Sequence, residues 1–215
     1  MSAAEIGEPR AERLRLGLQI GLSYGMLEGA LWTSGRVQVA FSTAGVAALL
    51  LTTLRERRFW PNLGIGLQAV TRALWFIPVA AGVAGLILLG AWSVHTLHPP
   101  SHPALAALQG LQYLLWALAQ QFILESFLFT RLECLFGGRA AVLGAALLFA
   151  IAHIPNPVLV PVTWVGGLIL CELFRRYRTI YVPALAHALV ALSLSISVPE
   201  SVLHHMRVGI AYFLR

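Results

Sequence analysis

The chain has 215 residues, of which 58% are hydrophobic and only 11% are charged. Soluble domains average about 25% charged residues, so this composition excludes a water-soluble domain and indicates a polytopic membrane protein. All 15 basic residues are arginines, and they occur in short segments between apolar stretches. This distribution is typical of membrane topology and argues against a nucleic-acid partner.

Apolar segments along the chain predict an all-α transmembrane helix bundle of about seven or eight spans. The fifth and sixth segments are shorter than the roughly 20 residues that cross a bilayer, so we expect broken or tilted helices there. In chain order the segments are Leu16–Trp32, Val37–Leu54, Ala73–Val94, Ala104–Thr130, Ala140–His153, Pro161–Phe174 and Ile180–Val198.

We interpret the whole chain, residues 1–215, as a single membrane domain without internal repeats. Residues 1–103 form a three-span N-terminal region, and residues 104–198 form a four-helix core. Residues 199–215 are a tail or a short helix, because Val202–Leu214 is too short and too polar to assign as a span.

Arginine placement predicts a cytoplasmic N-terminus in a multi-pass protein of a bacterial inner membrane. Alternate inter-span segments hold twelve arginines, whereas the other segments hold only Arg36 before the tail begins. Positive charge is enriched on the cytoplasmic side of membrane proteins. The twelve are Arg10, Arg13, Arg15, Arg55, Arg57, Arg58, Arg72, Arg131, Arg139, Arg175, Arg176 and Arg178.

Polar side chains interrupt three of the apolar segments at similar depths. With about 1.5 Å of helix rise per residue, Gln121, Glu125, His153 and His187 lie roughly 9 to 20 Å from the cytoplasmic arginines. Gln121 and Glu125 are four residues apart and share a helix face. Such residues can act as polar contacts between helices. A glutamate and two histidines at one depth exceed that need, so we expect one polar cavity.

Residues from about 120 to 195 resemble the CAAX protease and bacteriocin-processing (CPBP) family, also called the type II CAAX prenyl endopeptidase or Abi family. Three motifs define that family: EExxxR, FxxxH, and HxxxN or a relative of it. Phe149 and His153 match the second motif, and a Phe-Gly turn precedes them at Phe136. His187 matches the start of the third motif, but its asparagine position falls on Ala191.

The first motif can be aligned in two registers. Counting back from His153 by the family's usual spacing puts the glutamate pair on Gln120 and Gln121, and the arginine on Glu125. Local matching of ESFLFT instead keeps the first glutamate as Glu125 and puts the arginine on Thr130. We prefer the local register, because loop length varies more easily than a catalytic residue. In both registers the motif retains one carboxylate, that of Glu125.

The resemblance implies an intramembrane endopeptidase that acts on a membrane-anchored or prenylated protein or peptide. An amide cannot take a proton from water at neutral pH, so Glu125 is the expected base. His153 and His187 are then expected to hold the oxyanion or to protonate the leaving amine, and Gln121 to orient the water.

Two other interpretations stay open. The chain could keep the family's fold without catalysis, and bind or regulate a membrane partner. Alternatively, Glu125, His153 and His187 could bind a divalent metal, since two histidines and a carboxylate form a known open ligand set. We otherwise expect no cofactor, and the sequence leaves the oligomeric state open.

Overall fold

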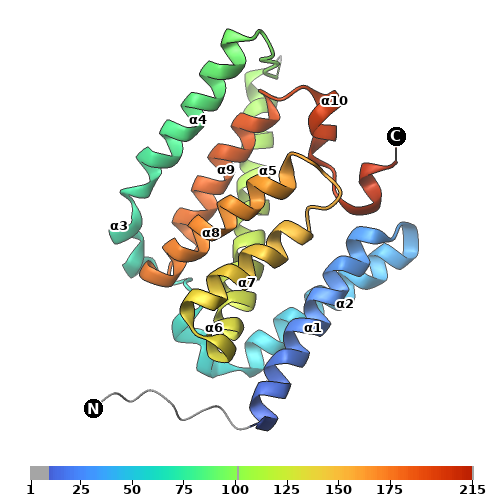
Figure 1. Ribbon diagram of the computed structural model, residues 1–215, viewed down its shortest axis with the longest axis vertical. Coiled ribbons are helices and arrows are strands. Elements are labelled where there is room, and N and C mark those ends of the chain that lie inside the picture. Colours follow the sequence, from blue (N-terminus) through green and yellow to red (C-terminus); the bar gives the residue numbers. More distant parts are fainter. Residues whose placement is uncertain (1–9, 101, 215) are drawn as a thin grey trace.

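The structure is a computed structural model that describes residues 10–100 and 102–214, and within these residues every regular element is helical. An N-terminal hairpin of two helices lies beside a bundle formed by the rest of the chain (Figure 1). The principal helices are α1 (Arg10–Trp32), α2 (Gly35–Arg55), α4 (Phe76–Ser93), α5 (Pro103–Gln121), α6 (Thr130–Phe136), α7 (Gly138–Ile151), α8 (Leu159–Tyr177) and α9 (Tyr181–Ser195). Shorter elements are η1 (Arg57–Asn62), η2 (Leu67–Ala69), α3 (Val70–Ala73), η3 (Phe122–Phe129), α10 (Glu200–Leu203), η4 (His204–Met206) and η5 (Gly209–Tyr212).

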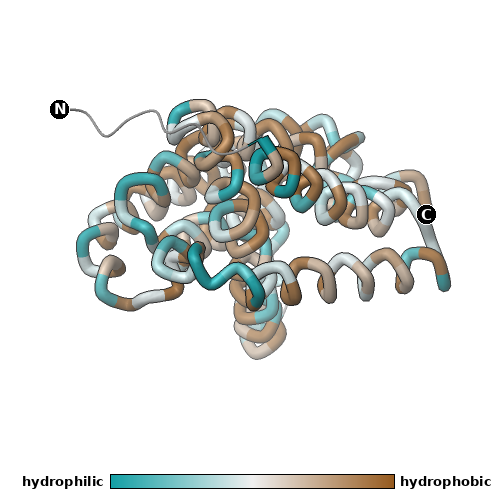
Figure 2. Tube along the Cα trace, turned by 90° about the horizontal axis from the view of Figure 1, so that it is seen from below, coloured by the Kyte–Doolittle hydropathy of each residue, from teal (hydrophilic) through white to brown (hydrophobic). Residues whose placement is uncertain are grey.

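Each apolar segment of the sequence corresponds to a helix, which confirms the all-α prediction. On length and composition alone, α2 and α4 are the described helices that could cross a membrane, while α7 and α9 are shorter apolar helices. Hydrophobic residues run along the outside of the bundle as well as inside it (Figure 2). A helical membrane bundle fits these features, and the number of spans stays a prediction.

The fourth apolar segment differs from the prediction, which ended it at Thr130 and put Arg131 in a loop. The helix instead continues through α5, the π-helix η3 and α6, and it ends at Gly137, whose φ of 83° favours glycine. Arg131 is fully buried on this helix. Its guanidinium lies over the Phe127 ring at 3.7 Å and donates to the Gln19 side chain at 2.9 Å. These partners explain how an arginine is accommodated inside the bundle.

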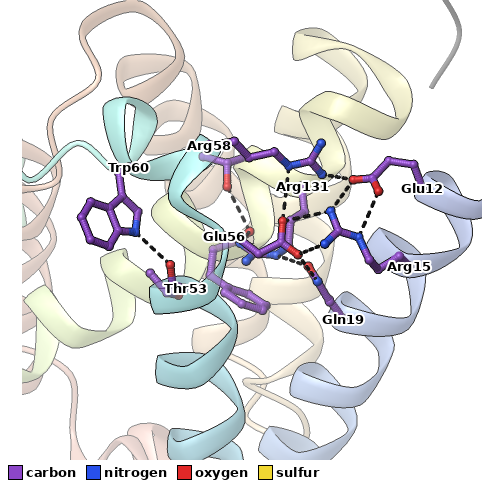
Figure 3. A network of polar contacts seen from close by, with 10 residues as sticks. Glu12, Arg15, Gln19, Thr53, Glu56, Arg58, Trp60 and Arg131 are labelled. Atoms are coloured by element: carbon purple, nitrogen blue, oxygen red, sulfur yellow. Dashed lines mark hydrogen bonds and ion pairs between the residues drawn. The ribbon is translucent and has the colours of Figure 1, made fainter. Parts of the chain in front are cut away.

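A polar network at the arginine-rich end connects α1 to the start of η1 and to α6 (Figure 3). Glu56, which precedes η1, accepts a hydrogen bond from Gln19 at 2.5 Å and pairs with Arg15 at 2.6 Å. The Gln19 side chain therefore bridges Glu56 and Arg131. This network attaches the N-terminal hairpin to the long helix that carries the first motif.

The C-terminal tail folds back over the bundle as the short segments α10, η4 and η5. The buried Asn156 side chain donates to the carbonyl oxygens of Leu203 at 2.8 Å and Arg207 at 3.2 Å. Gly209 adopts a φ of 56°, and a β-carbon there would lie 2.1 Å from the Leu31 carbonyl oxygen. The tail is thus fixed between α1 and the loop that follows α7.

Candidate functional site

A cavity of about 830 Å³ lies between α1, α4, α5, η3, α7, α8 and α9, and its wall is mostly apolar. The few polar side chains on the wall come from four of the bundle's segments and from α1. They are Tyr24, Tyr113, Gln120, His153, Thr163 and His187. An apolar cavity with a small set of convergent polar groups is the usual form of a ligand or active site.

His153 follows the last turn of α7 with its imidazole in a defined tautomer. Nδ1 lies 2.6 Å from the Phe149 carbonyl oxygen, which can only accept, so Nδ1 carries the proton. The neutral ring therefore presents its unprotonated Nε2 as an acceptor. The Phe149 ring packs edge-on against His153, with centroids 4.7 Å apart, and fixes the imidazole plane.

His187 lies on α9 and has the opposite tautomer. Its Nδ1 lies 3.1 Å from Nε2 of Gln121, an amide nitrogen that can only donate. The proton of the neutral ring therefore sits on Nε2. Edge-on contacts with Phe149 at 5.8 Å and Tyr113 at 6.2 Å hold the ring from two sides.

Phe149 contacts both imidazoles, so the two histidines occupy one part of the cavity wall. One ring offers a lone pair and the other offers an N–H. A base and a hydrogen-bond donor side by side can activate a water molecule and stabilise a negatively charged oxygen.

Glu125, the predicted base, lies elsewhere. It is fully buried in η3, does not line the cavity, and neither carboxylate oxygen has a hydrogen-bond partner. The structure thus brings Gln121, His153 and His187 together and leaves Glu125 behind the cavity wall.

Gln120 and Tyr24 reach the cavity, although neither was predicted from the sequence as a site residue. Gln120 lines the cavity, and Gln121 bonds to His187. These two glutamines occupy the glutamate positions of the first motif when the family's usual spacing is counted back from His153. That spacing was the available signal for Gln120. Tyr24 belongs to α1, outside the motifs, and no sequence pattern pointed to it.

A metal site at the predicted positions finds no supporting geometry. Among residues 10–100 and 102–214, no group of three or more His, Cys, Asp or Glu side chains is placed to hold a metal ion. Glu125 and the two histidines do not form such a group.

Residues 102–193 match the family described as type II CAAX prenyl endopeptidase Rce1-like, and no curated protein or solved structure matches the chain. The matched segment runs from the start of α5 into α9 and includes Gln120, Gln121, His153 and His187. The resemblance seen in the sequence motifs is therefore confirmed.

Proposed function

With an Rce1-like segment at residues 102–193 as the premise, we propose that this chain is an intramembrane endopeptidase of the type II CAAX prenyl endopeptidase kind. The observation that carries the proposal is the pair of histidines with complementary tautomers on the wall of an apolar cavity. A membrane-anchored peptide with an attached hydrocarbon chain fits such a cavity, because hydrocarbon is favourable against apolar side chains.

His153 is the general base in the proposed reaction. Its free Nε2 takes a proton from a water molecule, and the resulting hydroxide attacks the scissile carbonyl carbon. The Nε2–H of His187 donates to the carbonyl oxygen as negative charge develops on it. Gln121 fixes the His187 tautomer that makes this donation possible.

Glu125 requires a different role from the one that the sequence suggests. A general base must come within hydrogen-bond reach of the water, directly or through one more water. The Glu125 carboxylate is enclosed by η3 and its neighbours away from the cavity wall. We therefore assign proton abstraction to His153, and the activity of a Glu125 variant decides between the two residues.

A second candidate function is non-catalytic binding of a membrane-anchored or prenylated partner. The observation in its favour is the composition of the cavity wall, because none of the described residues that line it is a carboxylate. Ala191, at the position of the family's asparagine, also lines the cavity with a methyl group. Under this alternative the cavity holds the lipid chain and no bond is broken.

The two candidates are separated by reconstituting the protein in lipid vesicles with a farnesylated CAAX peptide, and measuring binding and cleavage by mass spectrometry. We expect the wild type to cut the peptide, and His153→Ala and His187→Ala to lose nearly all cutting. His98→Ala is the matched control, because His98 is an exposed histidine away from the cavity. Peptide that binds to the wild type and stays intact would establish the non-catalytic alternative.

A further inference from the structure

Three side-chain hydroxyls among the described residues line the cavity, and two of them are bonded to the backbone. The Tyr24 hydroxyl donates to the Leu148 carbonyl oxygen at 2.8 Å. The Thr163 hydroxyl donates at 2.7 Å to the carbonyl oxygen one turn earlier on α8. The third hydroxyl belongs to Tyr113 on α5, and no residue in the part of the chain that the structure describes hydrogen-bonds to it. This hydroxyl is therefore available to a molecule bound in the cavity.

Tyr113 packs beside His187. The two ring centroids are 6.2 Å apart, and the ring planes are nearly perpendicular, at 80°. Gln121 holds Nδ1 of His187 at 3.1 Å, so the protonated Nε2 faces away from Gln121. The Tyr113 hydroxyl and the His187 Nε2–H are thus two hydrogen-bond donors on neighbouring side chains of one cavity wall.

Packing explains only the ring of Tyr113 and not its hydroxyl. Phe149 packs edge-on against the same imidazole at 5.8 Å and needs no polar group to do so. A hydroxyl on an apolar wall without a partner costs free energy, and the hydrocarbon of a bilayer offers it no water. A bound molecule that supplies an acceptor oxygen removes this cost.

We propose that Tyr113 is a second donor, beside His187, to the scissile carbonyl oxygen as negative charge develops on it. This inference rests on the proposed endopeptidase function. Tyr113 is a catalytic residue in this scheme, because its hydroxyl contacts the reacting oxygen. It keeps its proton throughout and donates only a hydrogen bond. Such a bond is stronger to the charged oxygen of the transition state than to the neutral carbonyl, which is the condition for raising the rate.

The proposal also accounts for the methyl group of Ala191. Ala191 lines the cavity four residues after His187 and shares its helix face. An asparagine, the residue of the family's third motif, would bring an N–H donor to this position, and alanine brings none. Tyr113 supplies a donor to the same wall from α5 instead.

The first test compares Tyr113→Phe with the wild type in the vesicle assay, with kcat and KM measured separately. Phenylalanine keeps the ring that packs against His187 and removes only the hydroxyl. We expect kcat to fall about 100-fold, the lower end of the loss when one oxyanion donor is removed. KM should change little, because the apolar wall keeps its shape. Tyr177→Phe removes a hydroxyl from an exposed contact with Trp75 and serves as the control.

A double variant tests the same role by replacement. In Tyr113→Phe combined with Ala191→Asn, the asparagine amide adds an N–H donor one turn from His187. This protein should recover part of the kcat lost in Tyr113→Phe. A purely structural role of the Tyr113 hydroxyl would give no such recovery, because position 191 lies on a different helix.

A binding measurement tests the donor without turnover. A farnesylated CAAX peptide with a phosphinate in place of the scissile amide has the tetrahedral shape and negative charge of the transition state. Tyr113→Phe should bind this analogue about 100-fold more weakly than the wild type does. Its affinity for an analogue with a CH₂–CH₂ link at the same place should be unchanged, since that link has no acceptor oxygen.

Two results overturn this inference and leave the endopeptidase proposal intact. One is a wild-type kcat in Tyr113→Phe, and the other is an equal loss of affinity for both analogues in that variant. A wild-type protein that cuts no peptide overturns the endopeptidase proposal, and the donor role of Tyr113 with it.

Discussion

The side-chain amide of Gln121 determines which nitrogen of His187 faces the cavity. An amide nitrogen can only donate, so Nδ1 of His187 must accept and Nε2 must carry the proton. A carboxylate at position 121 would reverse this, because carboxylate oxygens accept and would draw the proton to Nδ1. A single oxygen-for-nitrogen difference therefore decides whether His187 is a donor or an acceptor toward a substrate.

Gln121→Glu should exchange the His187 tautomer. In wild-type protein labelled with ¹⁵N-histidine, solid-state NMR should show a His187 ring that is protonated on Nε2. In the variant the protonated nitrogen should be Nδ1. The His153 signals should keep a protonated Nδ1 in both proteins, since its partner is the Phe149 carbonyl. An unchanged His187 pattern in the variant would contradict the assignment of Gln121 as the residue that fixes the tautomer.

The sequence predicts His153 and His187 as site residues from their shared depth, and their catalytic role stays a prediction. Depth along apolar helices and the FxxxH spacing placed His153 and His187 at one site, and both line the cavity. Glu125 was expected to share a face with Gln121 by α-helical spacing. The helix becomes a π-helix from Phe122 onward, so the rotation per residue changes and the four-residue rule no longer applies.

Among the elements, the loop after α7 and the C-terminal tail depend on one side chain. Asn156 donates two hydrogen bonds to tail carbonyls, and its oxygen accepts from the backbone N–H groups of Val158 and Leu159 at the start of α8. A fully buried amide with four bonds connects three parts of the chain. The tail residues Met206 and Val208 line the cavity, so this connection also closes the site.

Asn156→Ala should lower the free energy of unfolding by about 2–3 kcal/mol, because buried carbonyl and N–H groups lose their partners. Asn156→Asp should lose the hydrogen bonds to the tail carbonyls and keep the oxygen that accepts from the N–H groups at the start of α8. Thermal unfolding in detergent measures the stability, and limited trypsin digestion at Arg207 reports release of the tail. Trypsin should cut the wild type at Arg207 much more slowly than it cuts either variant. Equal protection in all three proteins would show that Asn156 does not fix the tail.

Helix positions were predictable from apolar runs, but the end of the long helix was not. Arg131 suggested a loop because a charged residue inside an apolar bundle is costly. Phe127 is a partner one turn earlier on the same helix, but Gln19 on α1 and the ring of Phe59 come from distant parts of the sequence. Tertiary contacts of this kind leave no local pattern, so the sequence could not place the helix end at Gly137.

At the scale of the whole molecule, the arginine distribution predicts the orientation in a bacterial inner membrane. The arginine-rich loops lie at one end of the bundle (Figure 1), and this end holds the network of Glu12, Glu56 and Arg15 (Figure 3). The tail and the loop before α5 lie at the other end, where the His98 backbone bonds to Ile196 (Figure 1).

Reporter fusions test this orientation. A reporter that works only in the cytoplasm should be active when it is joined at Arg57 or Arg176. A reporter that works only outside the cytoplasm should be active when it is joined at His98. Loops rich in arginine are retained in the cytoplasm, which is why Arg57 and Arg176 are expected on the cytoplasmic side. Fusions at His98 and Arg57 that report the same side would contradict the predicted topology and the common depth of the site residues.

In the proposed reaction His153, and not the motif carboxylate Glu125, abstracts the proton from water. The most direct measurement is cleavage of the farnesylated CAAX peptide by purified Glu125→Gln and His153→Ala proteins in vesicles. Both must first show the wild-type melting temperature. The expected result is that Glu125→Gln cuts at close to the wild-type rate, since its side chain keeps its shape and lies off the cavity, while His153→Ala is inactive. An inactive, folded Glu125→Gln beside an active His153→Ala would contradict it.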